Sequence, residues 1–256
     1  MIVNYHTHTP RCGHAAGTER EYVEAALRAG VRTLGFSDHT PYDYGVPYRN
    51  SRVRMAVEEL PAYADAVRGL AAEYRDRLEI LLGVEAEYYP RHFARLLELL
   101  RRSGVRYMIL GQHFLGNETG EPYCGRPTDD TAVLERYVSQ SIEALQTGLF
   151  SYFAHPDLLG FTGGDDEYRR QMRRLCRAAK DGGVPLEINL LGIREGRSYP
   201  DERFWRIAAE EENAVVIGCD AHRPEHLLDR ESEEKALALA ERLGLQLTER
   251  VPLREI

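Results

Sequence analysis

The sequence predicts an α/β domain in which helices cover a parallel sheet. Short apolar segments alternate with amphipathic helical segments seven times along the chain, and helical connections of this kind join parallel strands. The 256 residues contain no linker and no shift in composition. We therefore expect one domain over residues 1–256, a length that suits a single α/β barrel.

The expected strands are short and rich in apolar, β-branched or aromatic residues. They cover residues 2–6, 33–36, 79–84, 106–110, 150–154, 185–188 and 214–218. Helical periodicity or helix-boundary residues fill the segments between them. The expected helices cover residues 18–30, 55–76, 90–102, 128–148, 165–181, a segment that begins at Pro200, and 224–243.

Local signals set the helix boundaries. Thr18 and Glu21 form a capping-box pattern, and Gly30 ends the periodicity that follows it. Thr128 is expected to cap the fourth helix. Pro200 suits a helix start, because its missing amide is not needed there and acidic residues follow it.

Charge and hydropathy exclude several classes of protein. The net charge of −8 argues against nucleic acid as the main partner. No apolar run of about 18 residues is present, so no membrane-spanning helix and no membrane partner are expected. The four cysteines form no C-x-x-C pair, and the N-terminus lacks the pattern of a secretory signal. We expect a cytoplasmic protein; nothing in the sequence indicates an oligomeric state.

Side chains that bind metals cluster where the expected strands end. They are His6 and His8, His39, Glu85, His113, His155, Asp220 and His222. A strand has a side-chain period of two, so His6 and His8 leave the same face. His14 lies in the first loop after a strand. In a closed parallel barrel all these positions meet at one rim, where barrel active sites are built.

These histidines and carboxylates suffice for two or three ions at three to four protein ligands each. Nitrogen-rich ligation favours zinc, iron or manganese over magnesium or calcium. Close pairs of such ions are a recurrent solution for the hydrolysis of phosphate esters. A single histidine is more often an ordinary polar residue, so the prediction rests on the whole set.

The motifs, taken in order, resemble those of the PHP (polymerase and histidinol phosphatase) superfamily. They are His6-Thr-His8, Cys12-Gly-His14, Ser37-Asp38-His39, Gly83-Val-Glu85, Gln112-His113, Ala154-His155-Pro156 and Cys219-Asp220-Ala-His222. The H-x-H-x5-H spacing and the segment from Glu187 to Pro200 look like the histidinol-phosphatase branch. The resemblance implies a distorted (β/α)7 TIM-like barrel, with the active site at the carboxyl ends of the strands.

The resemblance also implies a metal centre of two to three divalent transition ions. One ion would take His6, His8, Glu85 and Asp220; a second would share Glu85 and take His113 and His155; a third would take His14, His39 and His222. The implied function is hydrolysis of L-histidinol phosphate to L-histidinol and phosphate in histidine biosynthesis. The alternative is a PHP phosphoesterase acting on another small phosphate ester, such as a nucleotide or sugar phosphate.

The expected mechanism is in-line attack by a metal-bound hydroxide on a small-molecule phosphate ester. Arg194 and Arg197 are expected to hold phosphoryl oxygens as bidentate donors, and the alternative is that they are solvated loop charges. Asp38 is expected to accept a proton from the second nitrogen of a ligand histidine. Asn189, at a strand end, could contact substrate or serve only as a turn residue.

Several residues allow two interpretations. Glu87 shares the strand face of Glu85 and could be a ligand or its supporting partner. Glu118 and Glu195, like Asp43, could meet a cationic substrate amine, although a surface position is favoured. Cys12 is expected to be a small buried residue. Other residues are interpreted structurally: His92 and His226 on solvated helix faces, Asp157 as a turn cap, and the tyrosines at 42, 44 and 48 as a lid or as packing.

The alternative from a different class of protein is a metal-binding regulatory module that has lost enzymatic turnover. Such a module would be expected to lose ligands, and this chain retains the whole set. A nuclease is disfavoured by the net charge of −8.

Overall fold

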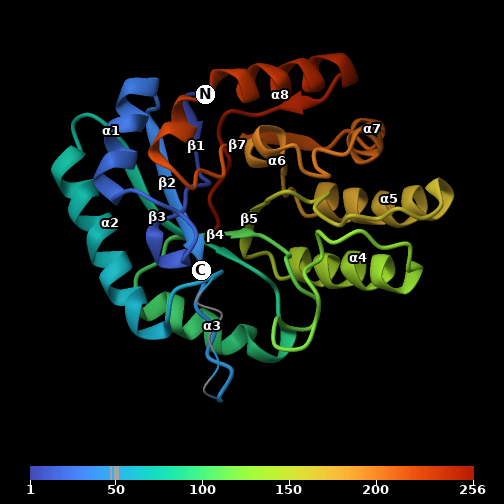
Figure 1. The fold of residues 1–256 in the computed structure, drawn as a ribbon, viewed down its shortest axis with the longest axis horizontal. Coiled ribbons are helices and arrows are strands. Elements are labelled where there is room, and N and C mark those ends of the chain that lie inside the picture. Colours follow the sequence, from blue (N-terminus) through green and yellow to red (C-terminus); the bar gives the residue numbers. More distant parts are fainter. Residues whose placement is uncertain (47, 49–51) are drawn as a thin grey trace.

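The described residues, 1–46, 48 and 52–256, form one parallel sheet with helices around it in this computed structural model (Figure 1). Its strands follow the chain order without interruption, and each neighbouring pair is parallel. They are β1 (Val3–Asn4), β2 (Thr33–His39), β3 (Glu79–Ala86), β4 (Tyr107–Leu110), β5 (Phe150–Phe153), β6 (Leu186–Asn189), β7 (Ala214–Gly218) and β8 (Gln246–Leu247).

The helices lie on the outside of this curved sheet (Figure 1). The α-helices are α1 (Glu19–Ala29), α2 (Leu60–Tyr74), α3 (Pro90–Arg102), α4 (Thr131–Gln146), α5 (Asp165–Asp181), α6 (Leu190–Glu195), α7 (Glu202–Glu210) and α8 (Arg230–Leu243). Short 3₁₀ helices are η1 (Pro10–Cys12), η2 (Val57–Glu59) and η3 (Pro224–Leu228).

The first and seventh strands meet at their carboxyl ends. A parallel bridge joins Thr7 to Ala221; the amide of His8 donates to the carbonyl of Ala221 at 2.9 Å, and the amide of Ala221 donates to the carbonyl of His6 at 3.2 Å. β8 pairs instead with Ala214 and Val215, at the opposite end of β7. The prediction of a distorted TIM-like barrel is confirmed, and the eighth strand lies in the tail that the sequence left unassigned.

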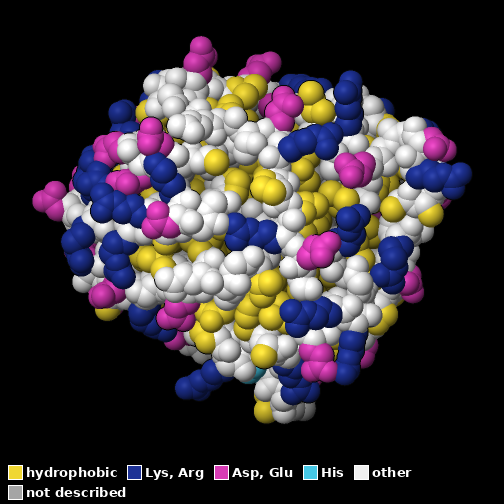
Figure 2. Space-filling model, turned by 180° about the vertical axis from the view of Figure 1, so that it is seen from behind, with side chains coloured by type: hydrophobic (Ala, Val, Ile, Leu, Met, Phe, Trp, Pro, Cys, Tyr) yellow, Lys and Arg dark blue, Asp and Glu magenta, His cyan; other side chains and the backbone are white. Residues whose placement is uncertain are grey.

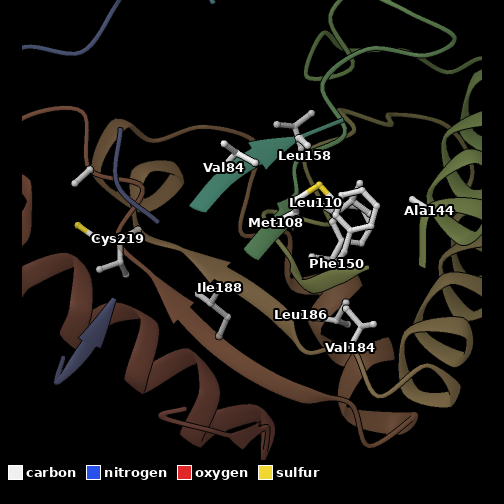
Figure 3. Packing of buried hydrophobic residues seen from close by; sticks show 14 of the residues in the cluster. Val84, Met108, Leu110, Ala144, Phe150, Leu158, Val184, Leu186, Ile188 and Cys219 are labelled. Atoms are coloured by element: carbon white, nitrogen blue, oxygen red, sulfur yellow. The ribbon is translucent and has the colours of Figure 1, made fainter. Parts of the chain in front are cut away.

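Apolar side chains fill both sides of the sheet. Between the strands and the helices, Met108, Leu110 and Phe150 point toward Ala144 of α4 (Figure 3). A second cluster fills the barrel interior, and the C-terminal tail contributes to it through Val251. Its members are Val3, Tyr5, Leu81, Tyr107, Ile109, Tyr152, Ala154, Val216 and Val251. This filled interior leaves the opposite rim for polar side chains.

Most helix boundaries agree with their sequence signals. Thr18 and Glu21 form the capping box of α1, and Gly30 takes the left-handed conformation that ends it. The fourth helix begins later than predicted, because Asp130 rather than Thr128 caps it by accepting the amide of Ala132.

Two further helical predictions need correction, and one helix was not predicted. Residues 190–195 form α6, a short helix that the sequence did not indicate. Asn189 caps the start of this helix. The predicted helix 224–243 is split at Asp229, which accepts the amide of Ser232 and so starts α8. The helix predicted at Pro200 begins at Glu202, with Asp201 as its cap. Residues 47 and 49–51 of the predicted loop 40–53 lie outside the described residues.

The surface carries charges of both signs. On the face seen in Figure 2, lysine and arginine side chains are interspersed with aspartate and glutamate. In the described part of the chain, no helix is both long and apolar enough to cross a membrane.

Candidate metal centre

The fold brings all the predicted metal ligands to one rim of the barrel. His6 and His8 follow β1, His14 follows η1, His39 ends β2, Glu85 lies in β3, His113 follows β4, His155 follows β5, and Asp220 and His222 follow β7. Parallel strands point the same way, so their carboxyl ends share this rim. The sequence prediction that these side chains converge is therefore met by the geometry, while their role as ligands remains a prediction.

The carboxylate of Glu85 stands at the centre, and one of its oxygens faces three imidazoles. Oε2 lies 3.5 Å from Nε2 of His6 and 3.5 Å from Nε2 of His8. It also lies 3.1 Å from Nδ1 of His39. This oxygen is buried and has no hydrogen-bond partner among the described residues.

The other oxygen of Glu85 faces a second pair of imidazoles. Oε1 lies 2.9 Å from Nε2 of His155 and 3.5 Å from Nε2 of His113. One carboxylate thus has nitrogen donors on both of its oxygens. This geometry would suit a carboxylate shared by two ions, and it places Glu85 rather than Glu87 in the centre.

Asp220 completes the first group of donors. Its Oδ1 lies 3.1 Å from Nε2 of His8 and 3.5 Å from Nε2 of His6, and it also has no hydrogen-bond partner in the described structure. The two Nε2 atoms of His6 and His8 are 3.1 Å apart. Tetrahedral zinc with bonds of about 2.0 Å holds its ligand nitrogens about 3.3 Å apart.

A third group lies nearer to solvent. Donor atoms of His14, His39 and His222 are within 4.8 Å of one another, and the Nε2 atoms of His14 and His222 are 2.9 Å apart. His39 lies equally within 4.8 Å of donor atoms of Glu85 and His113. His39 can therefore serve the third group or the group around Glu85.

The unpaired atoms show that a cation fits this centre. Among the described residues, Nδ1 of His39, Oε2 of Glu85 and Oδ1 of Asp220 are buried and form no hydrogen bond, whereas buried polar groups are almost always satisfied. The donors are imidazole nitrogens and carboxylate oxygens, which suit divalent transition metals. The residues present therefore fit the ions that the sequence predicts.

Burial and neighbouring charges shift the pKa values of the candidate ligands. Burial opposes ionisation of Glu85, but His113, His39 and His6 outweigh it and hold the pKa of Glu85 well below its usual value. Burial lowers the pKa of His14 to about 4, with contributions from His222 and His8. Burial also lowers the pKa of His39 and of His222. The imidazoles of His14 and His222 are thus mostly neutral at pH 7 and keep the lone pairs that bind metals.

Carboxylates behind the imidazoles orient their rings. Oε1 of Glu187 lies 2.9 Å from Nδ1 of His6, and Oε1 of Glu87 lies 3.1 Å from Nδ1 of His113. Such partners hold the proton on Nδ1 and leave Nε2 free for the metal. Sequence reasoning missed Glu187 as a partner of His6, although the strand face that it shares with Asn189 was a signal.

Backbone carbonyls do the same for the outer imidazoles. Nδ1 of His14 lies 3.1 Å from the carbonyl of Cys12, and Nδ1 of His222 lies 3.2 Å from that of Asp220. The predicted partner Asp38 is 3.4 Å from Nδ1 of His8. Asp38 is bound more closely by the hydroxyl of Thr9 and by the amide of His39, the latter at 2.8 Å, so its closest contacts are not with the imidazole of His8.

Strained backbone and close glycines support the centre. His155 and Asp220 have φ values of 34° and 48°, a region that residues with side chains adopt uncommonly. A Cβ on Gly111 would overlap the carboxylate of Glu85, and one on Gly218 would overlap that of Glu187. Glycine is needed at both positions to make room for these acids.

The centre forms the floor of a cavity of about 800 Å³. Three arginines (Arg52, Arg197 and Arg223), the acid Glu195 and the aromatic residues Phe114, Tyr123 and Tyr199 line its walls. The ring of Tyr123 lies nearly parallel to that of His113, at 14° and 6.3 Å between centroids. The cavity thus combines cationic, acidic and aromatic walls above the candidate metal ligands.

The residues that the sequence predicts to contact substrate have different surroundings in the structure. Arg197 lines the cavity and donates to Glu195 and to the hydroxyl of Tyr199. Arg194 is not part of the cavity wall; it pairs with Asp229 at 2.8 Å and donates to the carbonyl of Cys219. In this structure Arg194 therefore lies outside the cavity where phosphate would bind.

Asn189 is 1% exposed and fully engaged. Its Nδ2 donates to Glu187 at 2.9 Å and to Oδ2 of Asp220 at 3.1 Å, while its Oδ1 accepts the amide of Gly192. Asn189 therefore orients acids of the centre and caps α6. It has no side-chain atom left for phosphate.

Other expectations are corrected by burial. His226 lines the cavity rather than a solvated helix face, and its Nδ1 accepts the amide of His222. Glu118 is buried, not on the surface. Asp157 is also buried and accepts the amide of Asp201 and the indole N–H of Trp205.

Two further residues have a packing role rather than a role in the centre. His92 packs edge-on against Tyr44, away from the centre. Cys12 is fully buried as expected, and burial raises the pKa of its thiol, which disfavours the thiolate needed for metal binding.

The sequence matches a known protein family. The family model described as PHP domain matches residues 4–190. The chain belongs to the PHP domain family. The predicted resemblance is thereby confirmed.

Curated relatives of this PHP protein are named as phosphatases. A "Probable histidinol-phosphatase" from Deinococcus radiodurans is 34% identical over 231 residues, which are 87% of each chain. A "Histidinol-phosphatase" from Bacillus subtilis is 28% identical over 251 residues, covering 85% of this chain and 92% of the relative. The family and these relatives identify the chain as a PHP phosphatase.

Solved structures share the PHP fold. The histidinol phosphate phosphatase of Lactococcus lactis, crystallised with zinc, L-histidinol and phosphate, superposes with a TM-score of 0.74 at 19% identity and covers 96% of this chain and 95% of its own. A putative histidinol phosphatase from Listeria monocytogenes gives a TM-score of 0.76 at 17% identity, over 90% of this chain and 99% of its own. At these identities the likeness concerns the fold.

Proposed function

We propose that this PHP phosphatase is a metal-dependent phosphomonoesterase that hydrolyses L-histidinol phosphate to L-histidinol and phosphate in histidine biosynthesis. The observation that carries the proposal is the cluster of buried, partly unpaired imidazole and carboxylate donors at the floor of an arginine-lined cavity. The names of its relatives support the choice of substrate.

The proposed centre holds two to three divalent transition ions, of zinc, iron or manganese. The ligands of the first ion would be His6, His8, Glu85 and Asp220; those of the second Glu85, His113 and His155; those of the third His14, His39 and His222. When bound, such ions lower the pKa of water and neutralise the charge of phosphate.

Residues of the chain would bind and orient the ester. Arg197 and Arg223 line the cavity, and guanidinium groups bind phosphoryl oxygens in a bidentate way. Glu195 lies in the same wall beside Arg197 and could receive the ammonium group of histidinol. Tyr123 offers an aromatic face for its imidazole.

Phosphate release tests the proposal. Protein purified without chelator should carry metal and release phosphate from L-histidinol phosphate with a kcat/KM far above that for nucleoside and sugar monophosphates. Stripping the metal should abolish the activity, and readdition should restore it. The variant Glu85→Ala should lose both metal and turnover, because Glu85 reaches both groups of imidazoles.

Three other outcomes would contradict parts of the proposal. A preference for another phosphate ester would replace the substrate and keep the reaction class. Bound metal without release of phosphate from any ester would favour a regulatory module. Wild-type metal content and rate in Glu85→Ala would refute the bridging role.

A further inference from the structure

A buried ion-pair chain lies directly behind the metal centre. The side chain of Arg54 is 2% exposed and lies between the carboxylates of Glu87 and Glu118, both of them fully buried side chains. We infer that Arg54 and Glu118 are positioning residues, which hold His113 in place through Glu87 and fix two walls of the cavity. This inference rests on the proposed metal-dependent function.

Every N–H group of Arg54 is used. Nε and one terminal nitrogen donate to the two oxygens of Glu118 at 2.8 and 2.9 Å. The two terminal nitrogens donate to Glu87 at 2.8 and 3.1 Å, and the remaining N–H donates to the carbonyl of Thr40 at 2.8 Å. Only the planar, five-donor fork of arginine can satisfy this set, since lysine offers three donors from one point.

The chain of contacts ends on a candidate metal ligand. Oε1 of Glu87 receives both Arg54 and Nδ1 of His113, at 2.8 and 3.1 Å. The opposite nitrogen of His113 faces Oε1 of Glu85. Partners of this kind set the orientation and basicity of a metal-binding imidazole.

Charge balance gives Glu118 a role beyond packing. Arg54 carries one positive charge and pairs with two carboxylates. Because Glu118 neutralises part of that charge, Arg54 withdraws less electron density from Glu87 than it would if Glu87 were its only partner. Glu87 therefore keeps more negative charge for the N–H of His113. Without Glu118 the imidazole would be a weaker donor to a cation.

The same contacts join two segments of the cavity wall. Arg52 and Val53, next to Arg54 in the chain, line the cavity, as does Phe114 from the segment that leads to Glu118. The hydroxyl of Tyr44 donates to Glu118 at 3.0 Å, and the ring centre of Tyr42 lies 5.3 Å from the guanidinium carbon of Arg54. The ion-pair chain thereby fixes the cavity walls to the strand that carries the bridging acid.

The variants Arg54→Lys and Glu118→Gln test the inference. Arg20→Lys is the matched control, because Arg20 makes a bidentate pair with Glu73 at 2.5 and 2.7 Å on the exposed surface. For each purified protein, zinc per chain, zinc affinity by chelator competition, KM and kcat for L-histidinol phosphate, and the unfolding transition should be measured.

We expect Arg54→Lys and Glu118→Gln to weaken the zinc site that includes His113 by about 10- to 100-fold, the usual effect of losing such a partner. Their KM should rise because the cavity walls lose their anchor. Arg20→Lys should match the wild type in all these measurements. If Arg54→Lys does not fold, Glu118→Gln, which keeps the arginine and its pair with Glu87, carries the test.

The outcomes separate this inference from the proposed function. An active, zinc-containing wild type with both variants folded and unchanged in zinc affinity and KM would overturn the positioning role alone. Two variants that do not fold would reject it in favour of a purely structural role. A wild type without zinc and without phosphatase activity would overturn the proposed function and the inference with it.

Discussion

The substitution Gly111→Ala tests whether the centre needs Glu85 where the structure places it. Gly111 follows β4, and its amide donates to the carbonyl of Ala86 at 3.1 Å. A Cβ at this position would overlap the carboxylate of Glu85. Oε1 of Glu85 lies 2.9 Å from Nε2 of His155, so the carboxylate cannot yield without changing that contact.

The size of the effect follows from this overlap. We expect the carboxylate to move by about 1 Å, and a misplacement of about 1 Å can cost about 100-fold in rate. Overpacking a filled site lowers the free energy of unfolding by about 1–3 kcal/mol. The variant should therefore fold, bind metal more weakly and lose about 100-fold in kcat/KM.

The assay combines metal content, phosphate release and chemical unfolding. Gly69→Ala is the control, because no atom of the described residues lies within 4 Å of a Cβ at this exposed position in α2. Alanine should stabilise that helix by about 0.5–1 kcal/mol and leave activity unchanged. If Gly111→Ala kept the metal content and kcat/KM of the wild type, the placement of Glu85 would not matter and the reasoning would fail.

Four further predictions follow from the site. Glu187→Gln weakens the acceptor for Nδ1 of His6 and should lower zinc affinity by about 10- to 100-fold in a competition titration; an unchanged affinity would show that His6 needs no such partner. Arg197→Met should raise KM for the phosphate ester by about 10-fold or more, whereas a change in kcat alone would exclude a binding role. Zinc at about 100 times its dissociation constant should stabilise the fold by about 2.7 kcal/mol, seen as a higher Tm that a chelator reverses; a Tm that responds to neither reagent would contradict a resident metal. Burial raises the pKa of Asp157 to about 7, so its proton stabilises the folded state at low pH and this contribution is lost as the pH rises from about 4 to about 7. Asp157→Asn should flatten that part of the Tm profile, and an identical slope in both proteins would refute it.

The candidate ligands were predictable because of where they stand in the chain. An imidazole at the end of an apolar strand is conspicuous, and parallel strands bring such ends together whatever the details of packing. Glu187 was harder to assign, because it lies inside β6 between Leu186 and Ile188. Its shared face with Asn189 was a usable signal, since side chains two apart on a strand leave the same face.

Loop residues gave no such signal. Arg194 and Arg223 both follow a strand end, but only Arg223 lines the cavity. Arg194 turns away because Asp229 pairs with it, and that contact depends on how α6 and α8 pack. Arg54 and Glu118 lie in segments without periodicity, so their meeting is a result of tertiary structure alone.

The excess of buried acids at this rim supports the proposal that cations bind there. Glu85 and Asp220 face the cavity floor, and Glu187 and Glu87 back two of the imidazoles. Arg54 offsets part of this charge but contacts only Glu87 of these acids. Buried carboxylates in excess are costly unless protons or metal ions compensate them.

Protons and metal ions compete for the same imidazoles. Burial disfavours the charged form of His8, but Asp220 and Asp38 outweigh it and raise the pKa of His8 to about 9 in the absence of metal. A metal ion must displace that proton, so metal affinity should rise with pH until about pH 9. His14, with its pKa lowered to about 4, has no proton to lose at neutral pH. The site around Glu85 should therefore gain affinity with pH much more steeply than the outer site.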